Sequence, residues 1–285
     1  MPSKLHADIE AAIGKVVLSI IPLSGGCIAE VYQVRLADQS SIVAKVDNNR
    51  PARLVQEGAM LNYLAEYSRL PVPDVLHCSA GLLLIEFLEG ESRFSDSAQR
   101  CAAELLVDLH SITTDSFGFG SDTLIGGLHQ PNQKTTSWLQ FFRDQRLLYM
   151  GGEAVNAGRM PHTMLARLEK FSEKLDNWLT EPRQPALLHG DVWTTNVLAQ
   201  GGRITGFIDP AIYYGHPEIE LAFTTLFGTF GAPFFQRYNE IWPIEAGFME
   251  QRKDIYNLYP LLVHVRLFGG SYVQSVDKIL SRFGY

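Results

Sequence analysis

The fold of this chain is decided by one stretch, His189-Gly190-Asp191-Val192-Trp193-Thr194-Thr195-Asn196, and by Asp209 thirteen residues after it. Phosphoryl transfer needs little covalent chemistry from a protein, but it needs a positioned nucleophile and neutralised phosphate charge. On a short loop, Asp191 would orient a hydroxyl proton, and Asn196 would offer an amide oxygen to Mg²⁺. Asp209, at the end of the next hairpin, would supply a second metal ligand. The alternative is an ordinary turn rich in Asp, Asn and Thr, which loops favour.

An upstream lysine strengthens the first interpretation. Lys45 lies inside an apolar run, 42–46, that is typical of a strand. In the helix expected after it, Glu57 shares one face with apolar residues at helical spacing: Leu54, Gly58, Leu61, Leu64 and Ala65. Because a buried carboxylate is costly unless it is paired, we expect an ion pair between Lys45 and Glu57 that points the ammonium at nucleotide phosphates. The alternative is that both are surface charges on long, partly buried side chains.

The glycine-rich segment 24–29 is expected to join the first two strands. Its small residues Gly25, Gly26 and Cys27 would let the backbone approach phosphates and present N–H groups to them. Many hairpins carry Gly-Gly, so its position before the Lys45 strand is what favours a phosphate loop. Cys27 would then lie in an electropositive loop, a setting that makes thiols reactive, and is a candidate redox-sensitive cysteine. A small residue that fills a tight loop is the favoured alternative.

An apolar strand at 82–88 is the candidate hinge between two lobes. There the backbone of Glu86, Phe87 and Leu88 would offer N–H and C=O groups to an adenine ring, with apolar side chains around it. An ordinary core strand has the same pattern, and the sequence does not separate the two.

The pattern changes from strands to helices around this hinge. Before it we expect strands at 16–23, 30–36, 41–46 and 82–88, with one helix at 51–68. After it we expect helices at 96–111, 135–149, 163–179, 217–228 and 248–268, interrupted by short strands at 186–189, 197–199 and 204–208. The prediction is a two-lobed α+β fold, with a β-rich N-lobe over residues 1–88 and a mainly helical C-lobe over residues 89–285.

Composition argues against several other classes of protein. Of the 285 residues, 46% are hydrophobic and 19% are charged, which suits a folded core. The formal net charge is −7 and no dense Lys/Arg run occurs, so no nucleic-acid partner is expected. We find neither a signal-peptide pattern nor an apolar run of the roughly 20 residues that span a bilayer. Three scattered cysteines suit neither a disulfide framework nor a zinc site, so we expect a cytoplasmic protein. We expect no membrane partner, and we expect either a monomer or a dimer.

These residues, in this order, resemble the protein-kinase-like fold in its small-molecule branch, which is related to aminoglycoside phosphotransferases. Two segments resemble the fructosamine kinase (ketosamine 3-kinase) family more closely, 187–197 and 209–218, and Asp-Pro-Ala-Ile-Tyr-Tyr-Gly-His in the second is the specific one. Supporting matches lie at 25–28, 117–120, 138–146 and 267–270, so the resemblance runs from about residue 15 to residue 280. The chain departs from the family pattern at Thr194 and Thr195, which stand where the family often has smaller residues and which narrow the freedom of the loop.

The resemblance implies ATP- and Mg²⁺-dependent phosphorylation of the sugar 3-hydroxyl of ketosamines, the products of amine or protein glycation. The 3-phosphate is unstable and its loss frees the amine, so the implied substrates are small ketosamines or glycated proteins, and the implied outcome is deglycation. Carried over by position, Asp191 is the catalytic base, Asn196 and Asp209 hold Mg²⁺, and Lys45 contacts the phosphates with Glu57 as its partner.

Two rival functions stay open. One is another small-molecule kinase of the same fold, acting on an aminoglycoside, choline or a simple sugar. The other is a non-catalytic pseudokinase that serves as a binding module, against which the intact set Lys45, Asp191, Asn196 and Asp209 argues.

The acceptor side of the site is predicted from four further residues. Trp193 would stack on a sugar or an amine, or else pack against the helical lobe. Tyr214 and His216 would line the acceptor pocket, and Glu218 would face a cationic amine. For Glu218 the favoured alternative is an acid that complements the dipole in the first turn of a helix. Glu220 is expected to hold the catalytic loop from that same helix.

Overall fold

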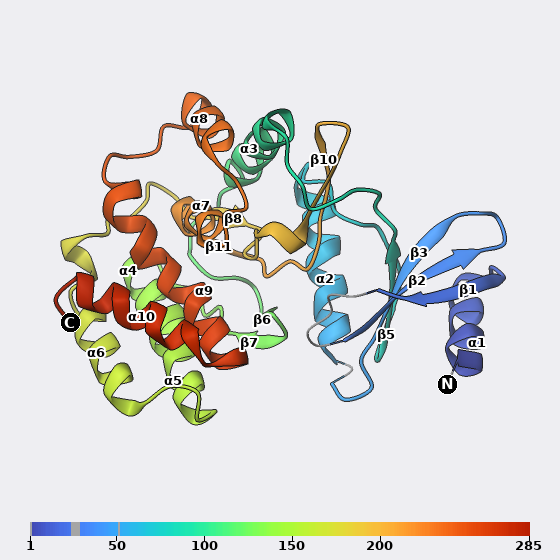
Figure 1. Ribbon diagram of the computed structural model, residues 1–285, viewed down its shortest axis with the longest axis horizontal. Coiled ribbons are helices and arrows are strands. Elements are labelled where there is room, and N and C mark those ends of the chain that lie inside the picture. Colours follow the sequence, from blue (N-terminus) through green and yellow to red (C-terminus); the bar gives the residue numbers. More distant parts are fainter. Residues whose placement is uncertain (1, 24–28, 51) are drawn as a thin grey trace.

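The computed structural model describes residues 2–23, 29–50 and 52–285, and it has two lobes, with the N-lobe on the right and the C-lobe on the left of Figure 1. The N-lobe holds a five-stranded antiparallel sheet in the order β1-β2-β3-β5-β4. Its strands are β1 (Val17–Pro22), β2 (Glu30–Leu36), β3 (Ser41–Val46), β4 (Val75–Ser79) and β5 (Leu82–Glu86), and its helices are α1 (Pro2–Ile13) and α2 (Ala52–Tyr67).

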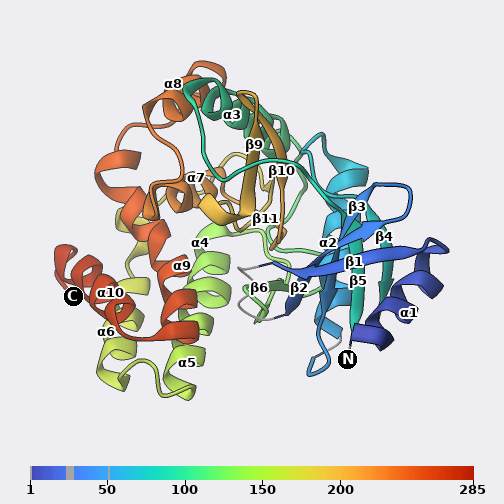
Figure 2. The same cartoon turned by 45° about the vertical axis from the view of Figure 1, so that its right-hand side comes forward.

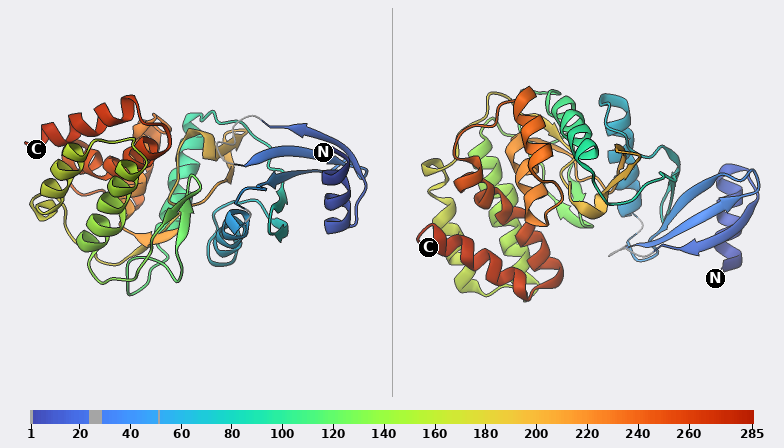
Figure 3. Two further views of the ribbon diagram at one scale, coloured as in Figure 1. Left: turned by 90° about the horizontal axis from the view of Figure 1, so that it is seen from below. Right: turned by 45° about the horizontal axis from the view of Figure 1, so that its top comes forward.

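Two helices cover opposite faces of this sheet. On one face Ile9 of α1 packs with Ala44 and Leu84, and on the other Leu54 of α2 packs with Leu83, among other residues. Figures 2 and 3 show α1 on the outer side of the sheet, and Figure 1 shows α2 between the sheet and the C-lobe. Because successive side chains of a strand point to opposite faces, the residue after Ala44 points toward α2 and the C-lobe. That residue is Lys45.

The C-lobe is built around one continuous apolar core to which nearly all of its helices contribute. The helices are α3 (Asp96–His110), α4 (Trp138–Phe141), α5 (Tyr149–Asn156), α6 (His162–Ser172), α7 (Pro217–Leu226), α8 (Ala232–Ile241), α9 (Lys253–Phe268) and α10 (Ser271–Arg282). A π-helical segment, η1 (Phe142–Leu148), joins α4 to α5, and a second one, η4 (Phe248–Arg252), precedes α9. Short 3-10 segments lie at Leu175–Asn177 and Thr194–Asn196.

Three two-stranded antiparallel pairs lie within the C-lobe and carry its loops. They are β6 (Thr123–Ile125) with β7 (Leu128–Gln130), β8 (Ala186–Leu188) with β11 (Tyr213–Gly215), and β9 (Val197–Gln200) with β10 (Arg203–Phe207). The loop 189–196 connects β8 to β9, and the segment 208–212 connects β10 to β11. Both connections therefore run between the β8–β11 pair and the β9–β10 pair.

The two-lobed α+β fold expected from the sequence is confirmed, and the strands expected at 30–36 and 41–46 are confirmed to the residue. The bounds predicted for the helix at 135–149 are wrong at both ends. The helix begins after Ser137, whose side chain accepts a bond from the Gln140 N–H as the N-cap, and it continues through η1 and α5 to Asn156. The strand expected at 82–88 ends at Glu86. The lobe boundary expected after residue 88 stays a prediction. Among the residues that the structure describes, no helix has the length and apolar character to cross a bilayer.

Candidate active site

The loop 189–196 crosses the segment that follows Asp209 at a point where only glycine fits. The Ala211 N–H donates to the His189 carbonyl at 2.8 Å, which holds the two segments together. Gly190 has φ +85°, and a Cβ on it would lie 2.1 Å from the Ala211 carbonyl oxygen. The left-handed conformation and the close approach both require a residue without a side chain. The crossing brings Asp191 into the electrostatic range of Asp209.

A buried acid on α7 holds this loop from behind. The Gly190 N–H donates to Glu220 Oε1 at 2.6 Å, and Glu220 Oε2 lies 2.9 Å from His110 Nε2, on α3. Burial alone would raise the pKa of Glu220, but the hydrogen bond and charge of His110 outweigh it and lower that pKa. Glu220 is therefore a buried carboxylate with partners on both oxygens, and the expected anchoring of the loop from its helix is confirmed.

Asp191 and Asn196, at opposite ends of the loop, are hydrogen-bonded to each other. Asn196 Nδ2 donates to Asp191 Oδ2 at 2.8 Å and to the Asp191 carbonyl at 3.0 Å. Burial, helped by the nearby Asp209 carboxylate, raises the pKa of Asp191 to about 8, although the bond from Asn196 opposes this. A raised pKa makes the ionised carboxylate a stronger base, although it also leaves more of the group protonated at neutral pH. The pair therefore presents an oriented proton acceptor to the cavity.

Lys45 connects the two lobes at this point. Its Nζ lies 2.5 Å from Glu57 Oε1, and it also makes an ion pair with Asp209 Oδ1. Burial alone would lower the pKa of Lys45, but the carboxylates of Asp209 and Glu57 outweigh it and raise that pKa. Burial raises the pKa of Glu57 against the attraction of Lys45. The ion pair of Lys45 with Glu57 expected from the sequence is present.

Asp209 has a backbone conformation that few residues with a side chain adopt. Its φ is +54°, in the left-handed region, and Gln39 is the only other described residue besides glycines with positive φ. Such a conformation is disfavoured, so it persists only where the surroundings enforce it, and it is common at functional sites. Here the Ile208 N–H donates to the Asn196 carbonyl at 2.9 Å, which ties the turn before Asp209 to the loop. The backbone turns the Asp209 carboxylate toward Lys45.

The donor atoms near this turn fit a hard divalent cation. The amide nitrogen of Asn196 donates to Asp191, and its Oδ1 accepts one long bond, from the Thr195 hydroxyl at 3.4 Å. An amide oxygen has a second lone pair, so Oδ1 can also act as a metal ligand, and the Asp209 carboxylate adds a second oxygen. Mg²⁺ prefers oxygen ligands and is commonly held by one or two side chains together with waters and substrate phosphates. Asn196 and Asp209 are therefore suitable residues to hold Mg²⁺, a role that stays a prediction.

A cavity of about 190 Å³ opens at these residues. Of the residues predicted for the site, six line it: Lys45, Glu57, Asp191, Trp193, Asn196 and Asp209. The N-lobe also contributes Val31, Asp47, Arg53, Leu54 and Met60, and the C-lobe contributes Leu124 to Gly127, Phe223, Pro260, Val263, His264, Leu267 and Phe268, among others. The predicted polar groups therefore share the cavity with a lining that is apolar over most of its C-lobe residues.

Three of the four predicted acceptor residues have other surroundings. The Tyr214 hydroxyl bonds to the hydroxyl of Tyr63 at 3.0 Å. His216 accepts a bond from the Glu218 N–H as the N-cap of α7, and Glu218 itself makes a double hydrogen bond to Arg252 at 2.6 and 2.7 Å. None of these three lines the cavity, and the position of Glu218 matches the helix-acid alternative. An acceptor role stays a prediction that the cavity supports best for Trp193.

The predicted nucleotide contacts lie partly outside the described residues. Gly25, Gly26 and Cys27 fall within 24–28, which the structure does not describe, so the phosphate loop and the reactive thiol stay predictions. Glu86 is exposed at the end of β5, and its N–H donates to the Asp74 carbonyl. Phe87 and Leu88 are half-buried in the connection that follows. Adenine binding by these three residues also stays a prediction.

Sequence reasoning missed the tip of the β6–β7 hairpin as a wall of the cavity. Gly126 and Gly127 form the turn with φ of +49° and +68°, between two short strands. Gly-Gly between such strands is a hairpin signal, so the hairpin itself was open to prediction. Its contact with α9, where a Cβ on Gly126 would lie 3.2 Å from Leu267, had no local signal.

Similarity to known proteins extends over nearly the whole chain. The family model for fructosamine kinase matches residues 1–283. A probable ketoamine kinase from the cyanobacterium Synechocystis sp. is 37% identical over 268 residues, which cover 91% of this chain and 88% of the relative.

Solved structures agree with this result. A structure from Thermobifida fusca, assigned as a fructosamine-3-kinase, has a TM-score of 0.85 at 30% identity and covers 98% of both chains. An aminoglycoside phosphotransferase solved with ADP and hygromycin B has a TM-score of 0.70 at 18% identity and covers 99% of both chains. At that identity the second likeness concerns the fold alone, and it confirms the kinase-like architecture.

Proposed function

This chain belongs to the fructosamine kinase family and is an ATP-dependent phosphotransferase, and we propose that it phosphorylates the sugar 3-hydroxyl of ketosamines with Mg²⁺-ATP. The proposal rests on one observation above all. Lys45, Asp191, Asn196 and Asp209, which come from two lobes and from positions up to 164 residues apart, line a single cavity. A pseudokinase has no need to keep that arrangement complete.

In the proposed reaction, Asp191 acts on the acceptor hydroxyl. Its carboxylate accepts the hydroxyl proton while the acceptor oxygen forms a bond to the γ-phosphorus and the bond from that phosphorus to the leaving ADP oxygen breaks. The bond from Asn196 Nδ2 fixes the orientation of the Asp191 carboxylate, and Glu220 fixes the loop through the Gly190 N–H. Positioning of this kind accounts for a large part of catalysis when the nucleophile is a neutral hydroxyl.

The phosphate side depends on charge. Lys45 would contact the nucleotide phosphates, with Glu57 holding its ammonium in place at 2.5 Å. Mg²⁺, held by Asn196 and Asp209, would neutralise charge on the phosphates. Lys45 also pairs with Asp209, so the same carboxylate would be shared between the lysine and the proposed metal.

The product of this reaction would be a ketosamine 3-phosphate. Such a compound loses phosphate and releases its amine, so the proposed consequence is deglycation of small ketosamines or of glycated proteins. We place this activity in the cytoplasm, and we propose no nucleic-acid or membrane partner.

A panel of acceptors tests the proposal. The protein is incubated with Mg²⁺-ATP and with ketosamines made from glucose or ribose, either free or on a protein lysine. An aminoglycoside, choline and free fructose are the comparison acceptors. We expect ADP release and a new phosphate ester on the 3-carbon, seen by ³¹P and ¹³C NMR, with the ketosamines only.

Two results would contradict the proposal, and they differ from each other. Phosphorylation of the aminoglycoside, choline or free sugar in preference to every ketosamine would assign the chain to another small-molecule kinase. Nucleotide binding without ADP release, whatever the acceptor, would assign it to the pseudokinases.

A further inference from the structure

Arg146 is a fully buried cation that the proposed mechanism does not use. It lies in the π-helical segment η1, within the Trp138 to Arg146 motif, and is 0% exposed. In the part of the chain that the structure describes, it makes no ion pair with a carboxylate. Burying a charge is costly unless partners compensate it, so a buried arginine indicates a specific structural role.

The compensation comes from neutral groups. Arg146 Nη1 donates to the carbonyls of Pro131 and Gln145 at 2.7 and 3.0 Å, and Nη2 donates to Asn132 Oδ1 at 2.7 Å. The guanidinium also lies 4.0 Å from the ring centre of Tyr213. The planar guanidinium of arginine carries separate N–H donors that reach these acceptors, whereas the single ammonium of a lysine could not reach all of them.

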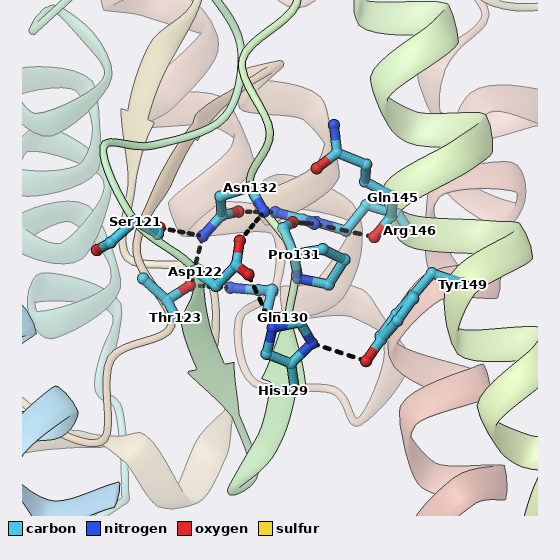
Figure 4. Close-up of polar contacts among 10 residues, drawn as sticks. All are labelled: Ser121, Asp122, Thr123, His129, Gln130, Pro131, Asn132, Gln145, Arg146 and Tyr149. Atoms are coloured by element: carbon cyan, nitrogen blue, oxygen red, sulfur yellow. Dashed lines mark hydrogen bonds and ion pairs between the residues drawn. The ribbon is translucent and has the colours of Figure 1, made fainter. Parts of the chain in front are cut away.

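Figure 4 shows hydrogen bonds that continue from Arg146 through Asn132 to Thr123. Further bonds lead from there to the segment after Asp209. Asn132 Nδ2 donates to Thr123 Oγ1 at 2.7 Å, and the Thr123 hydroxyl donates to the Ile212 carbonyl at 3.2 Å. Gln130 Nε2 donates to Thr123 Oγ1 at 2.8 Å and to the Ala211 carbonyl at 3.0 Å. The network therefore ends two and three residues after Asp209.

The network contacts two segments whose neighbouring residues line the cavity. Thr123 begins β6 and Gln130 ends β7, so the bonds fix the base of the hairpin whose tip, Leu124 to Gly127, lines the cavity. Ala211 also donates its N–H to His189, directly before the Gly190–Asp191 turn. Thus one buried side chain holds the cavity wall, the segment after Asp209 and, through it, the catalytic loop in one arrangement.

The exposed edge of the hairpin has a second set of hydrogen bonds, which meets the buried network at Asn132, since the Asn132 N–H donates to Asp122 Oδ1 at 2.9 Å. His129 lies between Asp122, at 2.9 Å, and the Tyr149 hydroxyl, at 2.7 Å, and so connects the hairpin to α5 (Figure 4). All three side chains reach solvent. Exposed pairs of this kind contribute little, which leaves the buried network as the main constraint on the hairpin.

We propose that Arg146 is a positioning residue for phosphoryl transfer: it sets the hairpin wall and the Asp209 segment relative to Asp191. The effect of Arg146 on phosphoryl transfer rests on the proposed function. Its positioning of the hairpin and the Asp209 segment rests on geometry alone. Arg146 Nε has no hydrogen-bond partner among the described residues, so the buried charge depends on the bonds of Nη1 and Nη2. An arrangement that broke those bonds would leave the charge still less compensated, which favours the one observed.

Two variants and one control test this role. Arg146→Lys keeps the charge but removes the fork, and Thr123→Val removes the hydroxyl link with almost no change in shape or charge. Arg143→Lys is the matched control, because Arg143 lies in the same π-helical segment, is 41% exposed and pairs with its sequence neighbour Asp144. Kinetic constants are expressed per nucleotide-binding site, so that unfolded protein does not count.

For both variants we expect kcat with the acceptor to fall about tenfold or more and the Mg²⁺ requirement to rise, because the network also sets the Asp209 segment. The double variant should lose little more than Arg146→Lys alone, because both changes break the same network. Arg143→Lys should leave every constant unchanged. A merely stabilising role would lower the melting temperature and leave kcat per folded site intact, and that result would overturn the inference.

A second measurement keeps the test independent of the acceptor. Hydrogen–deuterium exchange should become faster in the peptides that cover 123–130 and 209–212 when Thr123 is replaced by valine. Exchange in β3 and α2 should stay unchanged. If the wild type phosphorylates no ketosamine but the exchange result holds, the proposed function fails and the positioning network stands; unchanged exchange in both peptides would overturn the network itself.

Discussion

Gly190 and Ala211 lie closer together than any side chain at position 190 would allow, since a Cβ there would be 2.1 Å from the Ala211 carbonyl oxygen. We therefore expect Gly190→Ala to abolish transfer and to lower the free energy of unfolding by about 2–4 kcal/mol, from the clash and the left-handed backbone together. Urea unfolding and steady-state kinetics measure the two effects.

Gly228 provides a control for that variant. It also has a left-handed φ, +65°, but a Cβ at this position would meet no atom within 4 Å beyond its chain neighbours. Gly228→Ala should therefore cost only about 1 kcal/mol and leave activity in place. Equal effects of the two alanines would mean that the backbone conformation matters and the close approach does not.

Asp191→Asn should separate binding from chemistry. The amide keeps the size of the side chain but removes the proton acceptor, so kcat should fall by roughly 10²–10⁴. The affinity for Mg²⁺-ATP, measured by calorimetry, should stay within about threefold, because the proposed metal ligands are other residues. A variant that transfers phosphate at the wild-type rate would remove Asp191 from the mechanism.

Glu57→Gln should weaken nucleotide and metal binding together. Lys45 has two carboxylate partners, and without the charge of Glu57 it would pair more strongly with Asp209. Both the lysine and the proposed metal ligand would then be less available, and we expect KM for ATP and the Mg²⁺ requirement to rise about tenfold. Glu66→Gln, an exposed change on the same helix, is the control and should have no effect. Unchanged Mg²⁺ dependence in Glu57→Gln would contradict the shared-carboxylate explanation.

His216 should make the stability of the protein depend on pH. Burial, assisted by the charge of Arg252, lowers the pKa of His216 to about 3 from the usual 6.5. Between pH 6.5 and pH 3 the unfolded chain binds a proton at His216 that the folded protein does not bind. The contribution of His216 to the free energy of unfolding is therefore complete above pH 6.5 and is lost as the pH falls toward 3. The loss is about 1.4 kcal/mol per pH unit, or about 2 kcal/mol at pH 5.

His216→Asn isolates this contribution. Asparagine is also a good N-cap, so the start of α7 should form as before. The free energy of unfolding of the wild type should drop more steeply from pH 7 to pH 5 than that of the variant, by about 2 kcal/mol. If the free energies of unfolding of the wild type and the variant had the same pH dependence, His216 would take up its proton as readily in the folded protein as in the unfolded chain.

The sequence predicted the parts of the site whose signals are local. The run around Lys45 has the apolar alternation of a strand, and Glu57 has the helical spacing that turns it toward that strand, so their pairing followed from two short patterns. The loop from His189 to Asn196 carried its own spacing. These elements depend on neighbours within one turn or one strand.

The sequence could not predict contacts between residues that are distant in the chain. Glu218 was weighed as a contact for a cationic amine, but Arg252, 34 residues later, occupies both of its oxygens. His216 had a local signal that favoured a different role, because a polar residue directly before proline and glutamate is a helix N-cap pattern. The wall formed by Gly126 and Leu267 depends on how α9 packs, which no short pattern reports.

The apolar interior is divided unequally between the lobes. The C-lobe has one continuous core, which Met60 and Leu64 of α2 also join, whereas the N-lobe sheet separates two small clusters, one under α1 and one under α2. Small separate clusters open at a lower free energy than a large connected one. Heat or denaturant should thus disorder the strands of the N-lobe sheet while the helices behind the loop 189–196 remain folded, and inactivation should precede the main unfolding transition.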